Sequence, residues 1–158
     1  MNPSIPVLIV GAGPTGLLLA AELCRRNVGC RLIDANPAPL GWDRATVVHP
    51  RSLEVFESLG LVEQFLSAGV KQRMARIHAD GSVIGEVNLS NCGSCYGFNI
   101  GISEEVTEKI LTEYLHQQGG EVVRSSKLVD LAEHADHIVA TIDHDGTTER
   151  ITANWVVG

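Results

Sequence analysis

The chain has 158 residues, of which 44% are hydrophobic and 20% charged, a composition typical of a folded domain rather than a disordered segment. Its net charge is -7 and its Lys and Arg are scattered, which argues against nucleic acid or an anionic membrane surface as the main partner. We expect no membrane span, because no apolar run approaches the roughly 20 residues that a span needs. The N-terminal apolar run is too short for a signal peptide, and the four cysteines form no disulfide framework, so we expect a cytoplasmic location.

A strand, a turn and a helix are predicted in succession near the N-terminus. Residues 7–10 are continuously apolar and rich in β-branched side chains, as in a parallel strand buried on both faces. The glycine-rich turn 11–16 follows, and residues 17–24 are apolar nearly all round, which predicts a helix covered on several sides, with Asn27 as its left-handed cap. Residues 30–34 are predicted to form the second strand, which completes a βαβ unit.

The middle of the chain predicts two short helices and a hairpin. The helices are expected at 51–59 and 61–68. Between 73 and 89 the pattern changes to a period of two around an Asp-Gly pair at 80–81, which is a hairpin signal. Residues 90–101 are rich in Gly, Asn, Cys and Ser and show little pattern.

The last third predicts a helix followed by several strands. Ser103 is a suitable N-cap, and the next two residues are glutamates that favour the positive end of a helix dipole. Short strands are predicted at 121–124, 127–131, 137–142 and 147–152, the last three as a meander, with a separate buried strand beginning at 155–157.

The turn at 11–16 has the chemistry of a dinucleotide site. Gly11, Gly13 and Gly16 fit the pattern G-x-G-x-x-G, in which the first glycine allows a tight turn, the second lets the backbone approach a pyrophosphate, and the third lets helix and strand pack closely. Backbone N–H groups and the helix dipole can then hold phosphates without a basic side chain. Asp34 ends the second strand about 20 residues later, where a carboxylate accepts hydrogen bonds from an adenosine ribose.

The choice of dinucleotide stays partly open on these residues alone. A carboxylate at Asp34 disfavours the 2′-phosphate of NADP, which leaves FAD or NAD as the occupant. A purely structural glycine turn is the alternative interpretation.

Four blocks of sequence resemble a known enzyme family. They are Gly-Ala-Gly-Pro-Thr-Gly at 11–16, Arg-Ala-Thr-Val-Val-His-Pro-Arg-Ser-Leu-Glu at 44–54, Ser-Glu-Glu-Val-Thr-Glu-Lys-Ile-Leu at 103–111, and Ile-Thr-Ala-Asn-Trp-Val-Val-Gly at 151–158. Together they resemble the single-component FAD-dependent aromatic hydroxylases, the para-hydroxybenzoate hydroxylase and phenol hydroxylase family of flavin monooxygenases. The resemblance covers essentially the whole chain and selects FAD.

The resemblance implies a fold and a domain organisation. We expect an α/β, Rossmann-like GxGxxG FAD-binding domain over 1–158, with a parallel sheet, a β-meander crossover and the beginning of a β-rich substrate layer. Residues 73–100 are expected to make an excursion into the sheet of the substrate domain. Members of the family are several times longer, so we expect this chain to be the truncated N-terminal FAD-binding part of a longer parent.

The implied activity is NAD(P)H- and O2-dependent hydroxylation of an aromatic, phenolic small molecule, with FAD as cofactor and NAD(P)H as co-substrate. The truncated chain need not be active alone, its oligomeric state is left open, and no catalytic acid or base can be named in it.

The resemblance also assigns cofactor-binding residues. The pyrophosphate is placed on Gly11, Ala12, Gly13, Pro14, Thr15 and Gly16, and the adenosine ribose on Asp34 and Ala35. Arg44 is expected to reach the FAD, since a guanidinium beside a diphosphate is always charged and offers several donors. Glu104 departs from the family, which usually has a Gln there whose amide touches FAD. A carboxylate facing the diphosphate would repel it, so Glu104 either points elsewhere or weakens the site.

Two other signals carry alternative functions. Cys92 and Cys95 form a C-x-x-C pair, which in a flavoprotein suggests an FAD-dependent disulfide oxidoreductase, although a Gly/Asn-rich loop favours inert cysteines. A non-catalytic FAD- or nucleotide-binding module is the other alternative. His134 and His137 are interpreted as exposed polar residues rather than metal ligands, and no metal site is expected.

Overall fold

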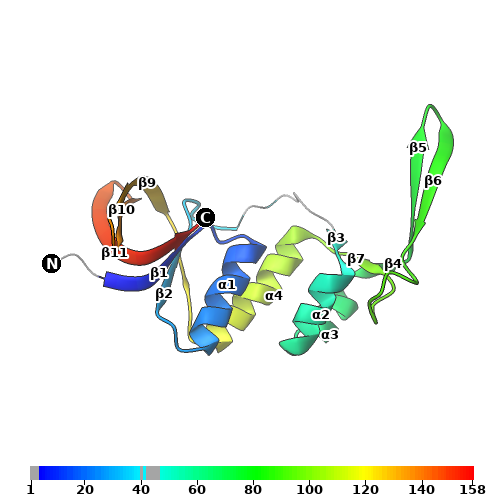
Figure 1. Cartoon of the computed structure of the whole chain (residues 1–158), viewed down its shortest axis with the longest axis horizontal. Coiled ribbons are helices and arrows are strands. Elements are labelled where there is room, and N and C mark those ends of the chain that lie inside the picture. Colours follow the sequence, from blue (N-terminus) through cyan, green and yellow to red (C-terminus); the bar gives the residue numbers. More distant parts are fainter. Residues whose placement is uncertain (1–3, 40, 42–46) are drawn as a thin grey trace. The chain divides into compact units, whose positions relative to one another are not determined.

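The computed structural model describes residues 4–39, 41 and 47–158 (Figure 1). The chain divides into two compact units, which are described separately below. The first unit comprises residues 1–41 and 111–158, and the second comprises residues 42–110. No helix in the described part of the chain is long and apolar enough to cross a membrane.

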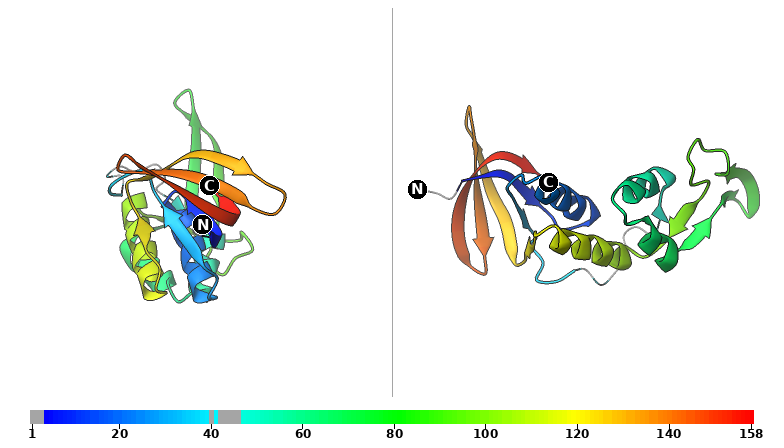
Figure 2. Two further views of the ribbon diagram at one scale, coloured as in Figure 1. Left: turned by 90° about the vertical axis from the view of Figure 1, so that its left-hand side faces the viewer. Right: turned by 90° about the horizontal axis from the view of Figure 1, so that it is seen from below.

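The first unit contains a mixed six-stranded sheet in the order β8-β2-β1-β11-β10-β9 (Figures 1 and 2). Its strands are β1 (Ser4–Val10), β2 (Cys30–Ile33), β8 (Val122–Val123), β9 (Ser126–Glu133), β10 (Ile138–His144) and β11 (Thr147–Val157). The strands β8, β2, β1 and β11 are parallel, whereas β9, β10 and β11 form the antiparallel meander that the sequence predicted. The α/β fold with a parallel sheet and a meander crossover is therefore confirmed.

The βαβ unit forms where the sequence predicted it. Helix α1 (Pro14–Arg25) joins β1 to β2, and Pro14 occupies its first turn, where a missing N–H costs nothing. The helix ends as expected at Asn27, which has the left-handed φ of 56°. The Asn27 and Val28 N–H groups donate to carbonyls of the last helical turn at 2.9 Å each. These bonds satisfy carbonyls that would otherwise lack partners at the helix end.

The core of this sheet joins the parallel part to the meander. Six of its side chains are fully buried together: Leu8, Ile33, Ala140, Ile142, Ile151 and Ala153. The separate buried strand predicted at 155–157 is wrong, because β11 runs unbroken from Thr147 to Val157. Trp155 lies near its end and is 69% exposed. Apolar character predicted burial there, but burial depends on what covers the strand.

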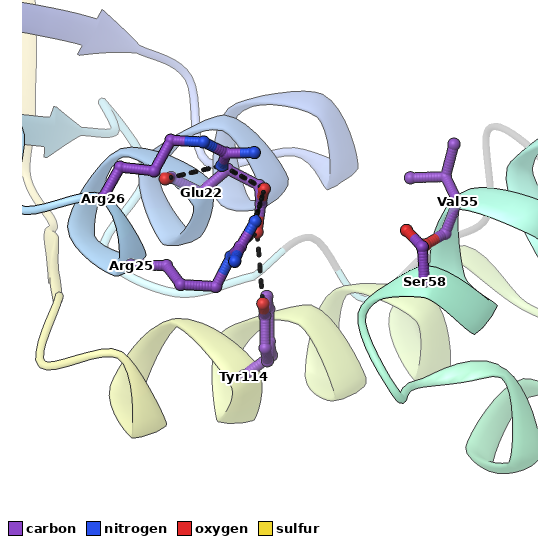
Figure 3. A network of polar contacts seen from close by, with 6 residues as sticks. All are labelled: Glu22, Arg25, Arg26, Val55, Ser58 and Tyr114. Carbon is purple, nitrogen blue, oxygen red and sulfur yellow. Dashed lines mark hydrogen bonds and ion pairs between the residues drawn. The ribbon is translucent and has the colours of Figure 1, made fainter.

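A polar cluster joins α1 to helix α4 (Glu104–Gln117), whose residues from 111 onward lie in the first unit (Figure 3). Glu22 accepts hydrogen bonds from Arg25 at 2.8 Å, from Arg26, and from the Tyr114 hydroxyl at 3.2 Å. Hydrogen bonding to Arg25, helped by Arg26 and Tyr114, lowers the pKa of Glu22 to about 2. Burial, followed by the bond to Glu22, raises the pKa of Tyr114. The ionised carboxylate therefore fastens the two helices together.

The described part of the second unit contains a three-stranded sheet, a two-stranded hairpin, two helices and the first residues of α4. Its helices are α2 (Pro50–Ser58) and α3 (Val62–Ala68), and the rings of Phe56 and Phe65 stack between them with centroids 4.1 Å apart. A three-stranded sheet has the order β3-β7-β4, with β3 (Val47–Val48), β4 (Val70–Gln72) and β7 (Asn99–Gly101). These short strands were not predicted, because two or three residues are too few to show a period.

The predicted hairpin is confirmed as β5 (Met74–Ala79) and β6 (Ser82–Asn88). Asp80 and Gly81 form its turn with left-handed φ values of 49° and 78°, the conformation that favours an Asp-Gly pair. Both strands are exposed along nearly their whole length, and they extend beyond the rest of the second unit (Figures 1 and 2). The hairpin is therefore held together mainly by the backbone hydrogen bonds between β5 and β6.

Replacing Glu22 by Gln should reduce the pH dependence of the free energy of unfolding at acidic pH. The folded-state pKa of about 2 lies below the usual 4.5, so the ionised carboxylate stabilises the fold above pH 4.5, and this contribution is lost as the pH falls through about 2. Urea unfolding between these pH values should therefore show a steeper loss in the wild type than in Glu22→Gln. The exposed Glu133→Gln serves as control and should keep the wild-type slope. Parallel curves for wild type and Glu22→Gln would contradict this role.

Candidate dinucleotide site

The turn between β1 and α1 requires glycine at two positions for reasons internal to the protein. Gly11 has a φ of +103°, which side chains rarely tolerate, and its N–H donates to the Ile33 carbonyl at 2.8 Å. A Cβ on Gly16 would lie 2.0 Å from the carbonyl oxygen of Gly11. The chain can therefore leave β1 and enter α1 at once only with these two glycines in place.

Gly13 is different, because nothing in the protein requires it to lack a side chain. Its φ is -74°, and a Cβ built on it would meet no atom within 4 Å. The space beside Gly13 is open, which fits a group approaching the backbone from outside. This is the position at which the G-x-G-x-x-G pattern places a pyrophosphate.

The N-terminus of α1 suits an anion. Gly13 is its N-cap, no side chain caps its N–H groups, and no acidic residue lies in its first turn. These N–H groups and the positive end of the helix dipole are therefore directed at the open space beside the turn.

Asp34 lies directly after β2 and is tied to this turn. Its Oδ2 accepts a hydrogen bond from the Ala12 N–H at 2.7 Å, and its Oδ1 accepts from the backbone N–H and the side-chain amide of Asn36 at 2.8 and 3.0 Å. The structure thus brings Asp34 to the predicted glycine turn, across the carboxyl ends of the neighbouring parallel strands β1 and β2. Ala35 follows on the exposed surface.

Arg124 was not singled out from the sequence. It follows β8, which pairs with β2, and its Nη1 lies 3.8 Å from Asp34 Oδ2. The signal that could have found it is positional, because residues that follow adjacent parallel strands meet at one edge of the sheet.

The other predicted cofactor residues belong to the second unit. Arg44 lies outside the described residues. Glu104 is the first residue of α4, and the Ser103 hydroxyl accepts from the Val106 N–H at 3.2 Å, as predicted for the N-cap. The glutamate suits that helix end, and its contact with FAD stays a prediction.

The second unit has a pocket of about 690 Å³ beside the hairpin. Its apolar wall includes Ile77, Val87 and Leu89, and its polar wall includes His49, Arg51 and Glu54. Hydrogen bonds from Ser94 and then Arg51 lower the pKa of Glu54, so the polar wall carries an ionised carboxylate beside a guanidinium. An amphipathic small molecule fits such a lining better than a fully apolar one.

The remaining candidate sites carry less chemistry. Cys92 and Cys95 are free and exposed, and they lie in a loop rather than in the first turn of a helix, where a thiol is activated. The rings of His134 and His137 stack on each other with centroids 4.6 Å apart. Among the described residues no group of three or more His, Cys, Asp or Glu could hold a metal ion.

Alanine at Gly16 and alanine at Gly13 should have opposite effects on stability. Gly16→Ala should lower the free energy of unfolding by several kcal/mol, on the order of 3, because its Cβ meets backbone that cannot yield. Gly13→Ala should change it by less than about 1 kcal/mol, since its backbone suits any residue. Urea denaturation of both variants makes the comparison. Equal destabilisation would show that the space beside Gly13 is not free.

The chain is similar in sequence and fold to several flavin-dependent and aromatic monooxygenases. The chain is 36% identical over 154 residues to 6-methylpretetramide 4-monooxygenase of Streptomyces rimosus, an alignment that covers 96% of this chain and 28% of that protein. It is 30% identical over 155 residues to pentachlorophenol 4-monooxygenase of Sphingobium chlorophenolicum, covering 96% and 29%. Among solved structures, anhydrotetracycline hydroxylase from Streptomyces rimosus matches with a TM-score of 0.85 at 25% identity, covering 98% of this chain and 31% of that one.

The chain thus spans less than a third of the length of these relatives. Residues 4–158 match the family described as FAD binding domain, a range that includes the glycine turn and Asp34. This protein chain belongs to that family of FAD-binding domains.

Proposed function

We propose that the chain is the FAD-holding part of an NAD(P)H- and O2-dependent flavin monooxygenase that hydroxylates an aromatic, phenolic substrate. The observation that carries the proposal is the space at Gly13, which the protein leaves open next to the carboxylate of Asp34, in a chain that matches an FAD-binding family along almost its whole length. The monooxygenase names of its relatives, one of which acts on a chlorinated phenol, support the reaction class.

The residues of the first unit would bind and orient the adenosine diphosphate half of FAD. Backbone N–H groups from Gly13 to Gly16 would donate to the pyrophosphate, and Asp34 would accept from a ribose hydroxyl. Bound FAD would supply the redox chemistry that links oxidation of NAD(P)H to reduction of O2. The protein's contribution is to hold the cofactor and the substrate in register and to exclude water.

Arg44 and Glu104 belong to the same proposal. A guanidinium at 44 would offset the charge of the diphosphate. Glu104 suits the first turn of α4, and its carboxylate would repel the diphosphate if it faced it, so Glu104 either points elsewhere or weakens the FAD site.

We further propose that residues 73–100 contribute to the substrate layer. The hairpin supplies apolar side chains to the lining of the 690 Å³ pocket, and α2 supplies an ion pair to the same lining. A phenol could place its ring against the apolar side chains of the hairpin and form a hydrogen bond through its hydroxyl to the ion pair of α2.

The four cysteines are free, which supports a reducing, cytoplasmic location. No observation favours a disulfide oxidoreductase.

The purified chain should bind FAD, and Gly13→Ala should weaken that binding. A methyl group at Gly13 occupies the space through which the pyrophosphate approaches, so the FAD dissociation constant should rise roughly tenfold or more. Flavin fluorescence quenching and the visible absorbance of retained flavin measure it. Gly85→Ala is the matched control, since its Cβ would meet only the Ile77 side chain, at 3.9 Å.

Binding of FAD by wild type and by Gly85→Ala but not by Gly13→Ala is the supporting result. A chain that neither retains FAD nor is stabilised by it refutes the proposal. Retention of FAD without phenol-stimulated oxidation of NAD(P)H would favour the non-catalytic module.

The pocket beside the hairpin should bind phenols through its apolar wall. Adding phenol should shift the backbone amide NMR signals of residues 49–54 and 75–89, and Ile77→Arg should abolish the shifts by placing a charge in the pocket. Ile84→Arg is the control, because Ile84 is 66% exposed and does not line the pocket. Shifts that survive Ile77→Arg would place the phenol elsewhere.

A further inference from the structure

Arg124 is held rigidly beside the loop that carries Asp34. The Asp34 N–H donates to the Val123 carbonyl at 3.0 Å, and the Ser126 N–H donates back to the Asp34 carbonyl at 2.8 Å. Between them, Ser125 adopts a left-handed φ of 51°, and its N–H donates to the Asn36 carbonyl at 3.3 Å. The two segments are thus joined on both sides of Arg124, so the backbone position of this arginine is set by that of Asp34.

The hydrogen bonds of Asp34 leave one place on its carboxylate. Two carboxylate oxygens offer about four acceptor positions, and three are filled, two on Oδ1 by Asn36 and one on Oδ2 by Ala12. The remaining position is on Oδ2, the oxygen that Arg124 faces at 3.8 Å. That separation is too long for a hydrogen bond but suits an ion pair. A ribose hydroxyl that donates to Asp34 must therefore use the oxygen next to this guanidinium.

The guanidinium of Arg124 has hydrogen-bond donors that the described protein residues do not use. It carries five N–H groups, and within the described ranges no residue accepts a hydrogen bond from it. Its side chain is 22% exposed, against 12% for that of Asp34, so part of it can be reached from solvent.

We propose that Arg124 binds the adenosine ribose together with Asp34. The ribose 2′-hydroxyl donates a hydrogen bond to Asp34 Oδ2, and its oxygen accepts a hydrogen bond from an N–H group of Arg124. The donor and the acceptor capacities of the hydroxyl are then both used. This inference rests on the proposed FAD function, but it concerns any ligand with an adenosine diphosphate group.

The test compares ADP with 2′-deoxy-ADP by isothermal titration calorimetry on the 158-residue chain and its variants. Arg124→Ala should weaken ADP binding roughly tenfold or more, as expected for a lost hydrogen bond to a charged donor. The same substitution should leave binding of 2′-deoxy-ADP almost unchanged, because that ligand has already lost the hydroxyl. Arg150→Ala, which removes an exposed arginine of β11, is the matched control and should alter neither affinity.

A role confined to charge or to local folding would weaken both nucleotides equally, and that result overturns the proposal, as does an unchanged affinity for ADP. Failure of the wild type to bind ADP also overturns it. Binding of ADP without binding of FAD would refute the flavoprotein function alone, while the comparison of the two nucleotides still decides the role of Arg124.

Discussion

The hydrogen bond from the Ala12 N–H to the Asp34 carboxylate, 2.7 Å long, joins the two loops on which the first unit's site depends. One loop follows β1 and leads into α1, and the other follows β2. The carboxylate is ionisable and only 12% exposed, so it needs partners, and it takes them from the turn and from Asn36. As a result, the backbone of the glycine turn is held in place by bonds within the protein before any ligand is present.

The parallel arrangement of β1, β2 and β8 places the useful groups at one edge. The residue that directly follows each strand belongs to the candidate site: Gly11 after β1, Asp34 after β2 and Arg124 after β8. An anion can bind there at the N-terminus of a helix, and a ribose hydroxyl can bind between a carboxylate and a guanidinium. The buried core between these strands and the meander fixes the edge, because Leu8 and Ile33 pack against side chains of β10 and β11. The Glu22 cluster then holds α1, whose N-terminus forms the anion site, against α4.

Local sequence patterns predicted much of the fold, because turns and helix ends depend on the conformational preferences of a few neighbouring residues. The Asp-Gly pair at 80–81 requires left-handed backbone and so marks a hairpin turn, and Asn27 ends a helix for the same reason. The short strands β3, β4 and β7 were missed, since each exists only through its pairing with a distant segment. Trp155 shows the same limit for burial: its apolar character suggested a covered strand, yet the side chain is 69% exposed.

The amino-acid order is sufficient to identify the dinucleotide turn, since the spacing of Gly11, Gly13 and Gly16 and the acid that follows reflect constraints within one short βαβ unit. The amino-acid order could not show why glycine is needed at each of the three positions. Gly11 and Gly16 are required by the turn itself, whereas Gly13 leaves a space that the protein does not use. This difference rests on the backbone angle of Gly11 and on the distances between atoms around Gly16 and Gly13. The sequence also could not distinguish Arg124 from the other arginines. Arg124 lies beside Asp34 only because β8 pairs with β2, and these two strands are far apart in the chain but adjacent in the folded sheet.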